Sequence, residues 1–147
     1  MSNPPRGAFI QRDKKSYAIV PRISAGLVTP DFLENVARVA RKYNVPLIKL
    51  TSAQRLALVG LNPEDVEKIW QELGADVGPA VGPCVHYVKA CPGTAACRFG
   101  ILDSLGLGLR LEKEFLGMDL PAKVKIGVSG CPNKCGEAYV RDIGLFG

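Results

Sequence analysis

The spacing of apolar and polar residues divides the first half of the chain into alternating extended and helical stretches. Residues 16–23, SYAIVPRI, are rich in β-branched and aromatic side chains and predict a strand. Apolar residues then recur every three or four positions over residues 30–43, which predicts an amphipathic helix. The hydroxyl of Thr29 and the ring of Pro30 favour a helix start at this point.

The same two kinds of pattern then occur a second time. Residues 46–59, PLIKLTSAQRLALV, predict extended chain with a bend at Thr51-Ser52. The stretch Asn62-Pro63-Glu64-Asp65 predicts the start of a second helix, whose apolar stripe includes Trp70 as a core residue. The order strand, helix, strand, helix over residues 16–74 predicts an α+β unit of the ferredoxin-like kind.

The periodic pattern stops at residues 74–83, GADVGPAVGP, where glycine, proline and small side chains follow one another. We therefore expect a domain boundary there, with one domain over residues 1–76 and a second over residues 77–147. The boundary separates the periodic first half from the part of the chain that contains all the cysteines.

The second domain is also predicted to mix strands and helix. A short strand is expected before Cys91, a long helical stretch at about 94–116, and a strand in the alternating residues 122–128. The final stretch, IGLFG, is apolar and resembles a strand in progress. We therefore expect the second domain to be incomplete at its C-terminus.

The composition is that of a folded protein without a membrane or export segment. Of the 147 residues, 47% are hydrophobic and 22% are charged, so the chain can bury a core and is not expected to be disordered. No apolar run approaches the roughly 20 residues of a membrane helix, and the N-terminus lacks the apolar centre of a signal peptide. We expect a cytoplasmic protein whose cysteines stay reduced.

The net charge of +5 changes this picture little. Basic chains bind nucleic acids, membranes or small anions, and many simply have a basic surface. The sequence contains no run of lysine or arginine like a nucleic-acid-binding tail, so we expect neither nucleic acid nor membrane as a partner.

Four of the five cysteines form two pairs. Cys91 and Cys97 are six positions apart, Cys131 and Cys135 are four apart, and a proline follows the first cysteine of each pair. Because proline suits the first helical position, each leading cysteine is expected at a helix start, where N–H groups stabilise a thiolate. Four such thiolates match the ligands that a [4Fe–4S] cluster requires.

Other sites built from four cysteines fit this spacing less well. Structural zinc sites usually separate paired cysteines by about two to four residues, disulfides need an oxidising compartment, and a bacterial ferredoxin would show C-x2-C-x2-C. Unrelated buried cysteines are a further alternative, and Cys84, which belongs to neither pair, is expected to be one. His86 is the only histidine and is expected to be structural, so a serine–histidine–acid triad cannot be assembled.

Two stretches around the cysteines resemble a known family of reductases. ACPGTAACRFGILDS at residues 90–104 and GVSGCPNKCGEA at residues 127–138 are similar to the sirohaem and [4Fe–4S] domain of sulfite and nitrite reductases. RISAGLVT and LTSAQRLALVG resemble the ferredoxin-like half-domain that precedes it, and the likeness covers about residues 8–147. TSAQR and CRFGILDSLGLGL look closest to nicotinamide-linked nitrite reductases, whereas the short length is similar to small, single-repeat sulfite reductases.

The resemblance implies an α+β fold, two cofactors and a reaction. Cys91, Cys97, Cys131 and Cys135 would ligate the cluster, and Cys135 would also bridge it to the sirohaem iron. The implied reaction is the six-electron reduction of sulfite to sulfide or of nitrite to ammonia. LGLGLR at residues 105–110 follows no strand and is not a dinucleotide fingerprint, so electrons are expected from a ferredoxin or a separate reductase subunit.

The family also implies roles for two lysines. Lys123 and Lys125 alternate along a predicted strand, so they share one face of it. They stand in LPAKVK, which resembles a family segment whose lysines face the substrate. A solvated lysine edge is the alternative that the pattern alone leaves open.

Three arginines are further candidates for binding anions. Tandem-repeat members of the family carry an anion-binding arginine at the position of Ala53, and Arg55 is expected on the same face of a strand. Arg22 and Arg98 are candidates for the sirohaem carboxylates, to which a guanidinium is suited. Each arginine could equally be a surface charge.

Two classes of function follow from the sequence. The first is an enzyme that reduces sulfite or nitrite, and because tandem members use two repeats per site, a single-repeat chain is expected to need a homodimer. The second is an iron–sulfur module, with or without sirohaem, that transfers electrons or binds a ligand and catalyses no reaction.

Overall fold

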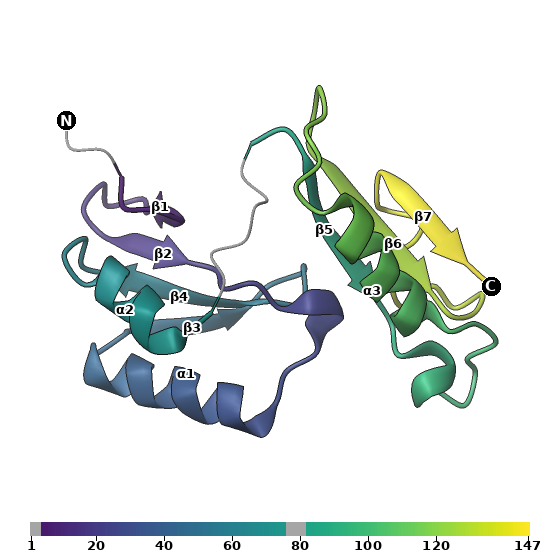
Figure 1. The fold of residues 1–147 in the computed structure, drawn as a ribbon, viewed down its shortest axis with the longest axis horizontal. Coiled ribbons are helices and arrows are strands. Elements are labelled where there is room, and N and C mark those ends of the chain that lie inside the picture. The colour runs from purple at the N-terminus through teal and green to yellow at the C-terminus, as the bar shows by residue number, and fades with distance from the viewer. Residues whose placement is uncertain (1–3, 76–81) are drawn as a thin grey trace. The chain divides into compact units, whose positions relative to one another are not determined.

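The computed structural model of the chain describes residues 4–75 and 82–147, which form two compact units. The first unit lies within residues 4–75. The second unit comprises residues 82–147 together with residues 24–26. Figure 1 traces both units along the chain. The boundary predicted at residues 74–83 lies largely outside the described residues, so the division after residue 76 stays a prediction.

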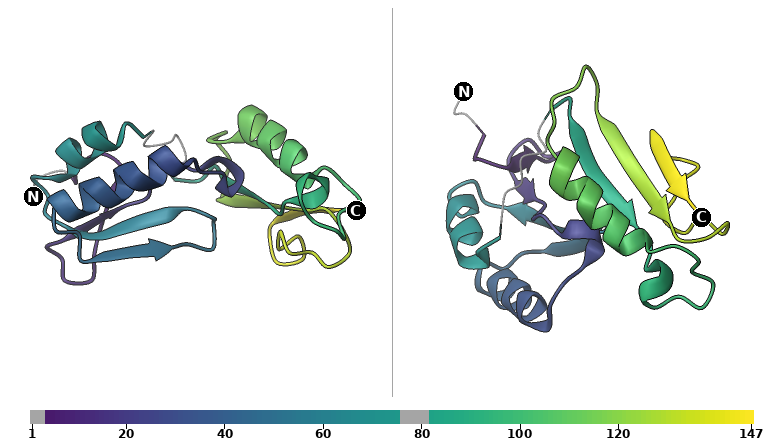
Figure 2. Two further views of the ribbon diagram at one scale, coloured as in Figure 1. Left: turned by 90° about the horizontal axis from the view of Figure 1, so that it is seen from below. Right: turned by 45° about the vertical axis from the view of Figure 1, so that its right-hand side comes forward.

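The first unit is an antiparallel sheet with two helices on one face (Figure 2). The sheet has the strand order β1-β2-β4-β3, and every neighbouring pair is antiparallel. The elements are β1 (Ala8–Ile10), β2 (Tyr17–Ile19), α1 (Pro30–Lys42), β3 (Leu47–Leu50), β4 (Leu56–Leu61) and α2 (Val66–Leu73).

Local sequence explains how α1 begins and why α2 begins later than predicted. The side chain of Thr29 accepts a hydrogen bond from the N–H of Phe32 at 3.2 Å, which confirms the predicted start of α1. The stretch that was expected to open α2 forms a turn instead, in which the N–H of Asp65 donates to the carbonyl of Asn62 at 3.1 Å. The helix therefore begins at Val66.

The extended stretch predicted at residues 46–59 is a hairpin of β3 and β4. Its bend is a turn in which the N–H of Thr51 donates to the carbonyl of Arg55 at 2.8 Å and the N–H of Arg55 donates to Thr51 Oγ1 at 3.2 Å. The prediction that Arg55 and Ala53 share one face of a strand is therefore wrong, because both residues lie in the turn.

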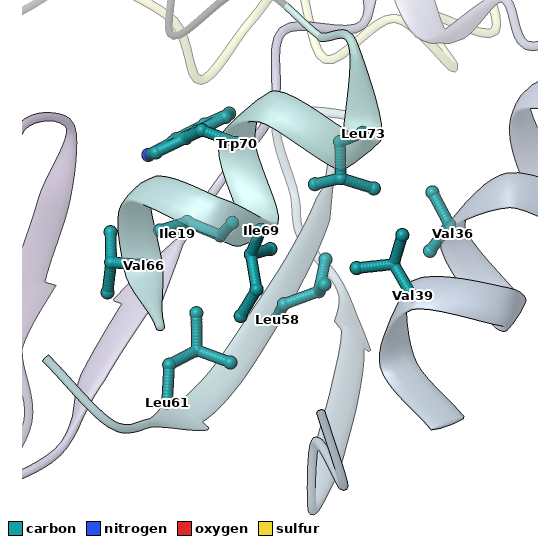
Figure 3. Close-up of a cluster of buried hydrophobic side chains, with 9 residues drawn as sticks. All are labelled: Ile19, Val36, Val39, Leu58, Leu61, Val66, Ile69, Trp70 and Leu73. Atoms are coloured by element: carbon teal, nitrogen blue, oxygen red, sulfur yellow. The ribbon is translucent and has the colours of Figure 1, made fainter. Parts of the chain in front are cut away.

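The core of the first unit lies between the sheet and its two helices (Figure 3). Trp70 has the core position predicted for it: it is buried, and its indole Nε1 donates to the carbonyl of Arg6 at 3.0 Å. Removal of this apolar surface from water is the main favourable term in folding. The buried cluster consists of Ile19, Val36, Val39, Leu58, Leu61, Val66, Ile69, Trp70 and Leu73.

The second unit is a parallel sheet of β5 (Val85–Ala90), β6 (Val124–Ser129) and β7 (Ile143–Phe146), in that order. The helix α3 (Ser104–Phe115) connects β5 to β6, and the short turns η1 (Ser24–Gly26) and η2 (Gly93–Ala95) complete the unit. The strands predicted before Cys91, at residues 122–128 and in the final stretch are confirmed. Within residues 4–75 and 82–147, no helix has the length and apolar character needed to cross a membrane.

The helical stretch predicted at 94–116 is only partly right. It is interrupted by an irregular loop, because the N–H groups of Ile101 and Leu102 donate to the carbonyl of Gly130 at 2.8 and 3.1 Å instead of to the preceding turn. The helix α3 then begins after Asp103, whose side chain accepts from the N–H of Gly106 at 2.8 Å.

The two faces of the second sheet are covered differently. The helix α3 packs closely on β5, since a Cβ at Gly108 would lie 2.8 Å from the Cβ of Ala90. Side chains alternate along a strand, so Gly127 on β6 faces away from α3. There it meets the segment 130–142, whose Gly136 carbonyl oxygen would lie 2.7 Å from a Cβ at Gly127. Figure 2 shows α3 and this segment on opposite sides of the sheet.

Glu72, near the end of α2, joins the two helices of the first unit. Its carboxylate accepts hydrogen bonds from Lys42 Nζ at 2.5 Å, from the Tyr43 hydroxyl at 2.6 Å and from Arg38 Nη1 at 3.0 Å. The bond from Lys42, followed by those from Tyr43 and Arg38, lowers the pKa of Glu72 to about 2. This carboxylate therefore stabilises the folded first unit in its ionised form.

We expect Glu72→Gln to destabilise the first unit in a pH-dependent manner. Because the folded pKa lies below the unfolded one, the contribution of Glu72 is fully present above about pH 4.5 and is lost as the pH falls through about 2. Denaturant unfolding followed by the fluorescence of Trp70, the only tryptophan, should therefore show a gap between wild type and variant at pH 7 that closes toward pH 2. Glu67→Gln, on the exposed side of the same helix, is the control. A gap that does not change with pH would contradict the assignment.

Candidate metal centre

Cys91 and Cys131 lie at the same edge of the second sheet. Cys91 directly follows β5, and Cys131 follows the last residue of β6 by two positions. The strands are parallel neighbours, and the N–H of Cys91 continues their pairing by donating to the carbonyl of Val128 at 3.1 Å. The carboxyl ends of adjacent parallel strands therefore carry one cysteine each, which is the edge where α/β sheets place their ligands.

Gly130 joins the loops that carry the two cysteine pairs. Its N–H donates to Cys91 Sγ at 3.1 Å, and its carbonyl accepts from Ile101 in the other loop at 2.8 Å. A Cβ at this position would lie 2.6 Å from Gly93 Cα, so only glycine permits this approach. The loop after β5 and the loop after β6 are thus packed backbone against backbone.

The thiol of Cys91 is buried but polarised toward its ionised form. Burial opposes the thiolate, yet the contact with the Ser104 hydroxyl, which also donates to the Cys91 carbonyl at 2.9 Å, and hydrogen bonds from the N–H groups of Gly130 and Gly93 outweigh it and lower the pKa of Cys91. Ser104 Oγ lies 3.3 Å from Cys91 Sγ and is itself completely buried. A thiol with these donors is suited to bind iron, because a metal ligand must be a thiolate.

The helix starts predicted at the two leading cysteines are not both present. After Cys91, Pro92 opens only the 3-10 turn η2. After Cys131 the chain forms turns and no helix. Lys134 and Glu137 have φ angles of 55° and 61°, in the left-handed region, which prevents a continuous helical turn through Cys135. The helix start predicted at Cys131 is therefore wrong.

The remaining two cysteines of the pairs are exposed, Cys97 in the first loop and Cys135 in the second. Among the residues that the structure describes, no three histidine, cysteine, aspartate or glutamate side chains gather closely enough to hold one metal ion. A [4Fe–4S] cluster takes one thiolate for each iron, so its ligands need not converge on a point. Four thiols on two loops locked together at Gly130, one of them with a lowered pKa, fit such a cluster by their chemistry.

The two lysines predicted to face the substrate lie at the opposite end of β6 from Cys131. Lys123 precedes the strand and is exposed, and Lys125 is its second residue. At a rise of about 3.3 Å per residue, Lys125 lies about 13 Å along the strand from Ser129, the last residue before the cysteine loop. Their predicted catalytic role stays a prediction.

The predicted arginines occupy different parts of the chain. Arg98 follows Cys97 in the first cysteine loop, where its guanidinium carbon lies 4.4 Å from the centre of the exposed Phe99 ring. Arg22 and Arg55 belong to the first unit. Cys84 is buried as expected, at the end of β5 away from Cys91, and His86 is a partly buried residue of the same strand.

Sequence reasoning missed the residues that support the cysteine loops. Ser104 could have been found as the first helical residue after a capping aspartate, in the stretch that directly follows the first cysteine pair. Lys89 carries no such local signal, because its contact with Glu137 joins residues that are 48 positions apart.

Comparison with known protein families identifies both units. The family described as "Nitrite and sulphite reductase 4Fe-4S domain" matches residues 81–147, and the one described as "Nitrite/Sulfite reductase ferredoxin-like half domain" matches residues 9–76. The chain belongs to the nitrite and sulfite reductase family. The resemblance noted in the sequence and the predicted order of an α+β half-domain followed by a cluster-binding domain are therefore confirmed.

Relatives of two kinds match nearly all of this family member. It is 64% identical over 147 residues to the assimilatory-type sulfite reductase of Nitratidesulfovibrio vulgaris, which is 100% of this chain and 67% of that protein. It is 43% identical over 140 residues to the NAD(P)H nitrite reductase of Bacillus subtilis, which is 95% of this chain but 17% of that enzyme. The chain thus corresponds to a part of each of these reductases.

Solved structures show the same fold at lower sequence identity. Dissimilatory sulfite reductase I aligns with a TM-score of 0.69 at 23% identity, over 82% of this chain and 30% of the other. The Mycobacterium tuberculosis NirA protein aligns with a TM-score of 0.64 at 21% identity, over 78% of this chain and 22% of the other. At these identities the likeness concerns the fold alone.

We expect Ser104→Ala to raise the pKa of Cys91. The substitution removes a hydroxyl that stabilises the thiolate, whereas burial, which favours the thiol, remains. The rate of Cys91 alkylation in the metal-free chain, measured by mass spectrometry against pH, should shift its midpoint to higher pH. Ser129→Ala is a matched control, because this equally buried serine accepts from Gly136 instead. An unchanged midpoint in Ser104→Ala would show that this hydroxyl does not stabilise the thiolate.

Proposed function

We propose that this chain is the cluster-bearing part of a sirohaem-dependent reductase that converts sulfite to sulfide or nitrite to ammonia. The main support is the bond from Gly130 to Cys91, which locks both cysteine loops together at one edge of a domain from the [4Fe–4S] family. The relatives named as a sulfite reductase and a nitrite reductase support both substrates. Both substrates are small anions.

The four paired cysteines are the proposed cluster ligands. Cys91 and Cys131 are buried at the strand ends, and Cys97 and Cys135 are exposed on the loops. When bound, the cluster and sirohaem would supply the electron transfer and the iron that holds the anion, which side chains cannot provide. The bridging role proposed for Cys135 fits its exposure, since its sulfur must be open to a second group.

Basic side chains are the proposed anion and carboxylate ligands. The exposed Arg98, beside Cys97, is suited to a carboxylate of the tetrapyrrole, because a guanidinium binds carboxylates through two N–H groups. Arg22 is a further candidate for a sirohaem carboxylate, and Arg55 is a candidate for binding the anionic substrate. Lys123 and Lys125 would attract the anionic substrate and deliver protons to it.

The position of the lysines favours a site shared between two copies of the chain. Lys125 lies about 13 Å along β6 from Ser129, so the lysines and the cysteine loops lie at opposite ends of the same sheet. In a two-fold dimer, the lysine end of one copy can approach the cysteine end of its partner. We therefore propose a homodimer that receives electrons from a ferredoxin or a separate reductase subunit.

The alternative is an iron–sulfur module without turnover of its own. It is favoured by the short span of the chain, which covers 67% of the sulfite reductase relative and 17% of the nitrite reductase relative. In that case the chain would take up the cluster and exchange electrons, and anion reduction would require further protein.

Cofactor uptake tests the proposal. After anaerobic reconstitution with iron, sulfide and sirohaem, the wild-type chain should show the haem bands in the blue and red together with the broad absorption of the cluster. Cys135→Ser should lose the electronic coupling between haem and cluster. Cys84→Ser, which changes the cysteine outside both pairs, should match wild type. Retention of both cofactors and full activity in Cys135→Ser would overturn the bridging role, and turnover with reduced methyl viologen separates the enzyme from the module.

A mixing experiment tests the shared site. A Lys123→Met/Lys125→Met chain and a Cys135→Ser chain should each be inactive, because each lacks one half of every site. When they are mixed and allowed to exchange subunits, half of the dimers are mixed and each has one intact site. Activity should therefore recover to about a quarter of wild type. No recovery, with subunit exchange verified by mass spectrometry, would contradict a site shared in this way.

A further inference from the structure

Glu137, two residues after the last cysteine, is paired with two cations, one from the sheet and one from its own segment. Glu137 Oε1 accepts from Lys89 Nζ of β5 at 2.5 Å, and Glu137 Oε2 is paired with Arg141, four residues further along the same segment. The lysine and arginine side chains are each only 12% exposed, so neither charge is fully solvated. Charges held out of water in this way need a partner, and Glu137 is the partner of both.

The backbone beside Glu137 is fixed at the same place. The N–H of Gly136 donates to the completely buried Ser129 Oγ at 3.0 Å. A Cβ at Gly136 would lie 2.0 Å from the carbonyl oxygen of Val128, so this glycine lies directly on β6. The Arg141 stem lies on the same strand, with its Cγ 3.0 Å from the Cβ position of Gly127.

Glu137 adopts an unfavourable backbone conformation to make these contacts. Its φ of 61° lies in the left-handed region, which costs free energy for a residue with a long side chain. The conformation persists because the surrounding contacts determine it. The ring of Tyr87, whose centre lies 5.3 Å from the Arg141 guanidinium carbon, adds a further contact on the β5 side.

We propose that Lys89, Glu137 and Arg141 form an ionic clamp that positions Cys135. The clamp holds the residue two places after this cysteine against β5 and β6, and Gly136 transmits the constraint to the cysteine itself. In this arrangement, Glu137 and its cations are positioning residues, which affect the cluster by fixing the position of the Cys135 thiolate. The inference rests on the proposed cluster for its consequence, but the clamp itself is a property of the metal-free chain.

The first test measures the clamp without any metal. Glu137→Gln keeps the length of the side chain and removes its charge, so the two cations lose their shared partner. Hydrogen exchange of the Gly136 amide in the metal-free full chain should become roughly tenfold faster or more. Opening of the segment around Gly136 costs less free energy when the two ion pairs of Glu137 no longer have to be broken. Glu72→Gln is the matched control, since it also removes a carboxylate held by a lysine and an arginine, in the first unit. Equal exchange in wild type and Glu137→Gln would overturn the clamp.

The second test measures the consequence for the cluster. After anaerobic reconstitution with iron and sulfide, Glu137→Gln should bind the Cys135 iron poorly. Its iron content should fall from four toward three per cluster, and the oxidised sample should gain the paramagnetic resonance of a three-iron cluster. Faster exchange at Gly136 with an unchanged four-iron spectrum would overturn the positioning role.

Further outcomes separate this inference from the proposed function. If the wild-type chain takes up no iron at all, the proposed function fails, and the clamp is judged by hydrogen exchange alone. If Glu137→Gln does not fold, Lys89→Gln replaces it, because Arg141 still pairs with Glu137 in that variant. Lys89→Gln should shift the same two readouts in the same direction by a smaller factor, and no shift in either would overturn the clamp.

Discussion

The hydrogen bond from the Gly130 N–H to Cys91 Sγ is the contact on which the candidate centre depends. It joins the end of β5 to the end of β6 and requires a residue without a side chain, because Gly93 approaches so closely. It also helps to lower the pKa of the Cys91 thiol against the effect of burial. A single backbone group thus fixes the geometry of two loops and favours the thiolate form of one proposed ligand.

The rest of the second unit supports that contact from both sides of the sheet. On one face, α3 begins at Ser104, whose hydroxyl lies beside the same sulfur, and it packs on β5 without space for a side chain at Gly108. On the other face, the segment 130–142 lies flat on β6 and is held by Glu137. The cysteines are therefore placed by a rigid parallel pair of strands and are presented by loops, as is common for ligand sites in α/β proteins.

Sequence patterns predicted the elements better than the loops. Thr29 and Pro30 marked the start of α1, and alternating residues marked β6, because caps and periodicity are local properties. The stretch 94–116 was predicted as helix from its residue pattern, and a helix start was predicted at Cys131 because proline suits that position. Contacts with distant residues interrupt the helix predicted at 94–116, since the N–H groups of Ile101 and Leu102 donate to the carbonyl of Gly130.

The family of the candidate site was predictable from the sequence, but the contacts that support its loops were not. The spacing of the cysteines and their flanking prolines and glycines indicated the family, which the comparisons confirm. The contacts of Ser104 with Cys91 and of Lys89 with Glu137 arise only after β5 and β6 have paired, and no spacing rule connects residues so far apart. The position of Lys125 relative to Cys131, in contrast, follows from the length of β6 alone once the strand is known.

The strand β7 has a consequence for how this chain behaves in solution. Among the residues that the structure describes it pairs with β6 alone, and Ile143, Leu145 and Phe146 are all substantially exposed. A strand with an open side offers unsatisfied amide and carbonyl groups to any extended peptide that reaches it, and apolar neighbours strengthen such an encounter. An extended segment that adds to this sheet would therefore be expected to pair along β7.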